Sequence, residues 1–138
     1  LEDADQRFGA YVGELSRGEV DAMARRLKVP KSHHRLAGWI ADWADGVARW
    51  RDQQPEVLYR ALSEARAFHP DSPLVRFLAV VESLKSVDLE PLVGMLDGVS
   101  VAVTPAKLQA RGLAGAELGR ALDEARVEAI AVALASGG

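Results

Sequence analysis

A run of basic residues near the N-terminal end of the chain is the first place where side chains could do chemistry. Seven cationic or imidazole side chains crowd into eleven residues with no acid among them: Arg25, Arg26, Lys28, Lys31, His33, His34 and Arg35. Such a run could neutralise several phosphate groups, and the histidines could add donors or stack on bases. The same charges could instead form a solvated helix end that complements a helix dipole. Both interpretations stay open.

A second candidate lies near the C-terminal end, where Gly112, Gly115 and Gly119 recur at short spacing. A short helix over 104–112 is predicted, because a threonine followed by a proline suits a helix start and a glycine can close it. A long helix then opens near Ala114 and runs to about Ser136. This predicts a helical hairpin. Its glycines either form a tight turn between packed helices or let a partner's backbone come close.

Other kinds of chemistry lack the residues that they need. Asp3 and Asp5 have no Gly-Ser turn or strand before them, so they are interpreted as ordinary acids at a helix start. His33 and His34 are adjacent and therefore point to different parts of a helix, with no third zinc ligand spaced to join them. The sequence has no glycine-rich phosphate loop and no Ser/His/Asp set. We expect no catalytic residue, metal or cofactor in this chain.

The composition limits the choice of partner. The 138 residues suit one domain, and their net charge is −3, so a role on RNA must rest on a local patch. The sequence contains no cysteine, which permits a reducing compartment, and no apolar run approaches the ~20 residues of a membrane span. We expect a cytoplasmic protein without a membrane partner. The sequence begins at Leu1 rather than methionine, so we expect a piece of a longer chain.

Apolar residues recur at helical spacing nearly throughout, which predicts an all-α irregular bundle of about seven or eight helices without a sheet. Before the hairpin, helices are expected over 3–15, 16–27, 32–50, 55–68, 72–84 and 88–98, followed by an extended connector over 99–103. The side chains expected in the core are Trp39, Ile40, Trp43, Val47, Leu62, Phe77, Leu78 and Leu118.

Residues 108–122, LQARGLAGAELGRAL, resemble the C-terminal DLxxxGxxxGxxxGxxL segment of the bacterial tRNA nucleotidyltransferase (CCA-adding) and poly(A) polymerase family. Residues 105–107 and Ala116 differ from it, because the family often has a glycine and an acid before the first leucine and a proline after the second glycine. Residues 7–40, RFGAYVGELSRGEVDAMARRLKVPKSHHRLAGWI, resemble an upstream part of the same family, in which an S-x-x-E helix ends in R-L-[KR] and a basic helix start follows. The two stretches occur in family order.

The resemblance implies a single all-helical domain over 1–138, body-like over 1–52 and tail-like over 53–138, similar to the poly(A) polymerase C-terminal region. The family's catalytic head, with its Mg²⁺ and nucleotide triphosphates, would lie outside this chain. The implied role is in tRNA processing by a transferase, in which this region binds tRNA and positions it for 3′-end nucleotide addition. Besides the basic run, the implied phosphate contacts are Gly115, at the start of the long helix, with Lys107, Arg111 and Arg120 around it.

Two other function classes stay open. The chain could be a stand-alone helical module for protein interaction or for homo-oligomerisation, which predicts a complex that forms without RNA. It could also be an enzyme with an unrecognised site, which predicts turnover by the chain alone. Binding of tRNA instead predicts an affinity that falls steeply with salt.

Overall fold

The computed structural model describes residues 16–27, 31–69 and 71–136, and this part of the chain is helical without a strand. Its elements are α2 (Arg17–Leu27), α3 (Lys31–Ala48), the 3-10 turn η1 (Trp50–Asp52), α4 (Pro55–Glu64), α5 (Leu74–Lys85), α6 (Glu90–Ala102), α7 (Pro105–Gln109) and α8 (Gly115–Ala135). The predicted all-α class is therefore confirmed. The helix expected over 3–15 lies outside the described residues.

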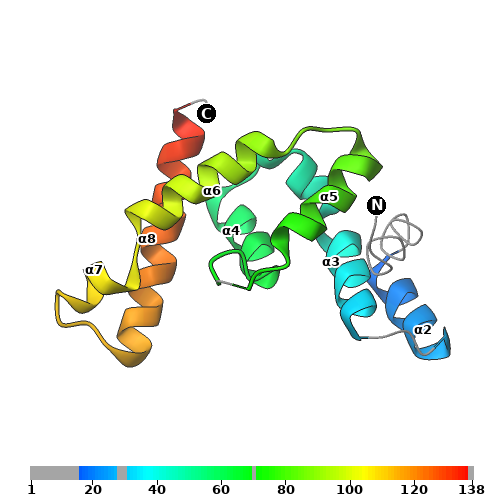
Figure 1. Cartoon of the computed structure of the whole chain (residues 1–138), viewed down its shortest axis with the longest axis horizontal. Coiled ribbons are helices and arrows are strands. Elements are labelled where there is room, and N and C mark those ends of the chain that lie inside the picture. Colours follow the sequence, from blue (N-terminus) through cyan, green and yellow to red (C-terminus); the bar gives the residue numbers. More distant parts are fainter. Residues whose placement is uncertain (1–15, 28–30, 70, 137–138) are drawn as a thin grey trace.

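The helices form an elongated arrangement. Figure 1 shows α2 at one end of the long axis and the hairpin of α7 and α8 at the other, with α3, α4 and α5 between them. Helix α3 packs against α2, α4 and α5, and α8 packs against α4, α6 and α7. The core is therefore formed by successive contacts between pairs of helices.

Trp39 joins three helices at the centre of the core. Its indole Nε1 on α3 donates a 2.8 Å hydrogen bond to the carbonyl oxygen of Ala61 on α4. Its ring lies 5.3 Å from the ring of Phe77 on α5, tilted by 45°. Both rings are buried, so the indole contributes apolar contact and a satisfied polar group at the same place.

Helix α8 is attached to this core through few buried side chains. Ile130 is completely buried in the main core, and it is the one residue of α8 in that class. At the solvent edge, the Tyr59 hydroxyl on α4 donates to Asp123 Oδ1 at 2.6 Å. The rest of the helix is half-buried or exposed along its described length.

Local signals predicted several helix starts correctly. Ser16 Oγ accepts from the amide of Glu19 at 3.2 Å, and Glu19 Oε1 accepts from the amide of Ser16 at 3.3 Å, which is a capping box at the start of the helix predicted over 16–27. Thr104 Oγ1 accepts from the Lys107 amide at 3.3 Å, with a proline at the first helical positions. These bonds satisfy amides that would otherwise lack a partner.

Three predicted boundaries were wrong. Helix α6 continues to Ala102, so 99–102 is helical and not an extended connector. The β-branched residues there disfavour a helix only weakly, and burial of Val99 on the same face as Leu92 and Leu96 outweighs that preference. The helix predicted over 32–50 begins instead at Lys31 and ends at Ala48.

The fourth predicted helix was also too long. Helix α4 ends at Glu64 because Arg66 takes a left-handed conformation with φ 57°. The amide of Ala67 then bonds the carbonyl oxygen of Leu62 at 3.0 Å, and the amide of Arg66 bonds that of Ser63 at 2.9 Å. This pair of bonds is a Schellman motif, and it places Phe68 in the following turn.

Most of the predicted core is confirmed. The buried members are Trp39, Ile40, Val47, Leu62, Phe77 and Leu78. The prediction was wrong for Trp43, which is half-buried because its indole Nε1 reaches out to the exposed Glu64 carboxylate. It was also wrong for Leu118, which is half-buried in the part of α8 that extends towards α7.

The core assignment predicts a large difference between two truncations of apolar side chains. Leu62→Ala should lower the free energy of unfolding by ~2 to 5 kcal/mol, because it truncates a fully buried side chain and leaves a cavity in the core. Val101→Ala, at a position that is 74% exposed, is the control and should change it little. Urea unfolding followed by circular dichroism measures both. Equal losses would contradict this placement of the core.

Candidate functional site

Four exposed cations lie where α2 ends and α3 begins. They are Arg25, Arg26, Lys31 and Arg35, and we call them the basic end. The arginines occupy the last turn of α2, and Lys31 and Arg35 lie in the first turns of α3. Because α2 packs against α3 and leads into it, the fold gathers these charges at one end of the helix pair. Lys28 lies outside the described residues.

The basic run contains no acidic residue, but an acidic side chain of α2 lies close to it in the folded chain. Asp21 Oδ1 lies 2.5 Å from His34 Nε2 and 3.2 Å from Arg17 Nε. Arg17 also reaches α3, where its Nη1 lies 3.0 Å from Asp42 Oδ2. His34 is therefore part of an ion-pair group that joins α2 to α3. His33 is half-buried beside it in the sequence.

Arg17 is a residue that the sequence analysis missed. Its guanidinium covers Gly38, where an added Cβ would lie 2.6 Å from Arg17 Cζ. The missing side chain of Gly38 thus lets the guanidinium lie against α3. A second contact between the two helices is a small apolar cluster in which buried Val20 and Ala37 meet. The only sequence signal for Arg17 is its i,i+4 spacing to Asp21.

The charges at the start of α3 oppose the stability of that helix. A helix N-terminus carries partial positive charge, so cations there are unfavourable, by roughly 0.3 to 1 kcal/mol each. The first turn of α3 holds no acid, and Lys31 and Arg35 are a like-charge pair at i,i+4 spacing. Arg25 and Arg26, at a helix C-terminus, fit the dipole. Helix stability therefore explains the arginines of α2 but not the cations of α3.

The hairpin is closed by glycine in a left-handed conformation. Gly112 has φ 89°, and its amide bonds the carbonyl oxygen of Gln109 at 2.9 Å. The amide of Leu113 bonds the carbonyl oxygen of Leu108 at 3.4 Å, which completes a second Schellman motif. Gly115, at the start of α8, has φ 60° and is exposed. The predicted hairpin is thus present, with α8 running to Ala135.

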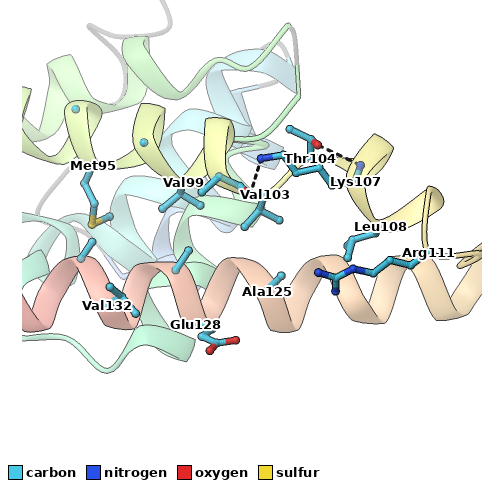
Figure 2. A pocket seen from close by; sticks show the side chains of 15 residues that line it. Met95, Val99, Val103, Thr104, Lys107, Leu108, Arg111, Ala125, Glu128 and Val132 are labelled. Carbon is cyan, nitrogen blue, oxygen red and sulfur yellow. Dashed lines mark hydrogen bonds between the residues drawn. The ribbon is translucent and has the colours of Figure 1, made fainter.

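The three cations of the hairpin have different surroundings. Lys107 Nζ donates to the carbonyl oxygens of Val101 and Ala102 at 3.2 and 3.3 Å, so it caps the end of α6 (Figure 2). Such a cation at a helix C-terminus is favourable. Arg111 is exposed and lies beside α8, and Arg120 is exposed on α8 itself.

An apolar groove of about 680 Å³ runs between α6 and α8 and is closed at one end by α7. Figure 2 shows Met95, Val99 and Val103 facing α8 across it. The walls also include small residues at four-residue spacing: Gly94, Gly98 and Ala102 on α6, and Ala125, Ala129 and Ala133 on α8. Val132 on the rim is 62% exposed.

The predicted site residues therefore fall into two groups that the fold keeps apart. The basic end lies with α2 at one end of the long axis, and the cations of the hairpin lie at the other (Figure 1). Within the described ranges, no three potential metal ligands gather at one place. None of the helices in those ranges has both the length and the apolar character to cross a membrane.

The ion-pair group of α2 and α3 predicts a pH dependence. The hydrogen bond from His34, with the charge of Arg17, lowers the pKa of Asp21 below its usual 3.8. The folded state thus binds this proton less readily than the unfolded state, so the stabilisation is present above pH 3.8 and is lost as the pH falls through the folded pKa. Asp21→Asn should be less stable than the wild type at neutral pH, and the difference should shrink in acid.

Urea midpoints of both chains over a series of pH values measure this difference. Asp71→Asn, at an exposed carboxyl outside the ion-pair group, serves as the control. A difference between wild type and Asp21→Asn that stays constant through the acid range would contradict the assignment.

The glycines of the hairpin predict opposite effects of the same substitution. Gly112→Ala should cost roughly 1 to 2 kcal/mol, because its left-handed φ of 89° disfavours a Cβ. At Gly119 an added Cβ would meet nothing within 4 Å, so the interpretation that this glycine serves helix packing is not supported. Gly119→Ala should instead stabilise α8 by up to about 1 kcal/mol. Thermal unfolding of both variants measures this, and destabilisation by Gly119→Ala would indicate a neighbour at that position.

Comparison with protein-family models, with curated proteins and with solved structures finds no match for this chain. The resemblance to tRNA nucleotidyltransferases therefore rests on the residues quoted for it, over 7–40 and 108–122.

Proposed function

We propose that this chain is an RNA-binding helical region, the body and tail of a tRNA nucleotidyltransferase-like protein, and that it holds tRNA through phosphate contacts. The observation that carries the proposal is the basic end. Lys31 and Arg35 are exposed at a helix start that they destabilise, and no ion pair of the described chain involves them. An RNA phosphate there would be attracted by both the side chains and the helix dipole.

The distribution of charge along the molecule supports a long partner. Arg111 and Arg120 of the hairpin are exposed at the opposite end from the basic end (Figure 1). An extended polyanion such as tRNA can contact both groups at once, whereas a small anion cannot. Lys107 contributes less in this proposal, because it already caps α6.

The chemistry of nucleotide addition is assigned to a catalytic head outside this chain. That head would supply the carboxylates that hold Mg²⁺ at the nucleotide triphosphate, since two cations must bridge the attacking and leaving oxygens. In this proposal the helical region positions the RNA and does not touch the reacting atoms.

A second candidate function is helix association, and the groove between α6 and α8 favours it. Its walls carry small residues that permit close approach of a backbone, and its rim leaves Val132 exposed. This function predicts a complex without RNA. Sedimentation of the chain alone, over a range of concentrations, would detect a complex with its own copies.

The RNA proposal predicts the effect of removing the basic end. Replacing Arg25, Arg26, Lys31 and Arg35 with alanine should weaken tRNA binding irrespective of sequence, because the lost contacts are to phosphates. The slope of log affinity against log salt should flatten by about 0.7 to 0.9 for each lost phosphate contact. Filter binding or fluorescence anisotropy at several salt concentrations measures both quantities.

Two variants that lose the same charge distinguish the effect of the basic end on binding from the effect of the protein's net charge. Lys31→Ala/Arg35→Ala and Arg49→Ala/Arg60→Ala each remove two exposed cations, the second pair from outside the basic end. The first should reduce both affinity and salt slope, and the second should change them much less. Unchanged binding by the quadruple variant, with wild-type binding measurable, would reassign the basic end to solvated surface.

A further inference from the structure

A small polar pocket of about 210 Å³ lies between the end of α4, the turn over 65–69 and α8. The polar side chains that line it are Tyr59, Ser63, Arg66, His69, Asp123 and Arg126. None of these residues belongs to the basic end, and none is among the hairpin residues proposed to contact phosphate, which are Lys107, Arg111, Gly115 and Arg120. The pocket therefore calls for an explanation independent of the proposed function.

Arg126 forms no ion pair with any of the described residues that line this pocket. Its Cζ lies 4.5 Å above the ring of Phe68, and its Nε is buried with no hydrogen-bond partner among the described residues. Among the described lining residues Asp123 is the one acid, and it accepts the Tyr59 hydroxyl at 2.6 Å instead of pairing with Arg126. Stacking on Phe68 fixes the guanidinium, so its remaining donors are held at the pocket in advance of a ligand.

Arg66 provides a second cation, at a position where the backbone favours glycine. Its φ of 57° is left-handed, at the residue that closes the Schellman motif of α4. A residue other than glycine in this conformation is strained, and such strain collects at functional sites. The arginine brings a charged side chain to the lining of the pocket, which a glycine would not.

The charged side chains that line the pocket have a net positive charge, which favours an anionic ligand. Arg66 and Arg126 are positive and Asp123 is negative, and no ion pair of the described chain involves Arg66, His69 or Arg126. Guanidinium groups match the oxygens of a phosphoryl group in geometry, and Ser63 and His69 can add further hydrogen-bond donors. We propose that this pocket binds a phosphoryl group, held mainly by Arg66 and Arg126.

Inorganic phosphate is the first probe. The full chain, labelled with ¹⁵N, is titrated with phosphate at constant ionic strength, and saturable shifts are expected at the amides of 63–69 and 123–126. Arg66→Gly should weaken the affinity by about tenfold, the loss of one charge-assisted hydrogen bond. The same variant should melt at an equal or higher temperature, because glycine relieves the left-handed conformation.

Two further variants test the role of charge. Asp123→Asn should tighten phosphate binding, since it removes the acid of the pocket but keeps an acceptor for Tyr59. Arg60→Ala removes a cation from the exposed face of α4 outside the pocket and should leave the affinity unchanged. Absence of saturable shifts at millimolar phosphate, or equal losses from Arg66→Gly and Arg60→Ala, would overturn the proposal.

A phosphoryl group could belong to a small metabolite or to an RNA backbone. A second titration distinguishes these two sources. A single-stranded RNA without terminal phosphates is titrated against the wild type and against Arg66→Gly. An RNA affinity that depends on Arg66 identifies the backbone as the source, whereas phosphate binding with an unchanged RNA affinity identifies a small phosphorylated ligand. The quadruple variant of the basic end keeps the pocket, so failure of the proposed function would leave phosphate binding intact.

Discussion

The buried hydrogen bond from Trp39 to Ala61 is the contact on which the arrangement of the other helices depends. The indole of α3 satisfies its N–H on the backbone of α4 while its ring packs on Phe77 of α5. A buried donor without a partner is costly, so the three helices must keep one relative position for the indole to be both covered and satisfied. The outer helices pack against this centre on two sides: α2 contacts α3, and α8 contacts α4.

The two ends of the molecule are built differently from its centre. Helix α2 meets α3 through a small apolar cluster and the ion-pair group of Arg17, and α8 contributes a single fully buried residue, Ile130. Apolar burial is the main source of stability, so the ends are less strongly held than the centre. The exposed cations argued to contact RNA lie on these ends, where a side chain is free to face solvent.

The fold was largely predictable because the apolar spacing and the capping residues act locally. The burial of Ile40 and Val47 and the helix start at Thr104 were predicted without tertiary information. The errors arose where packing outweighed local preference, as in the helical 99–102 segment, or where a side chain found a surface partner, as Trp43 did with Glu64.

The candidate sites were less predictable than the fold. The run at 25–35 looked free of acids, because Asp21 approaches His34 only after α2 packs on α3. The pocket between α4 and α8 had no sequence signal at all, since Arg66 and Arg126 are far apart in the chain and become neighbours through the contact of α8 with α4. No spacing rule connects residues at that separation.

The two Schellman motifs allow a glycine and an arginine to be compared at the same backbone position within one chain. The same pair of backbone bonds closes α7 with Gly112 and α4 with Arg66, so the molecule uses the relaxed residue at one helix end and a strained residue at the other. Stability alone would favour glycine at both positions. The arginine at position 66 therefore lowers stability in exchange for a role of its side chain. The gain in stability on replacing it with glycine would measure how much stability this role costs.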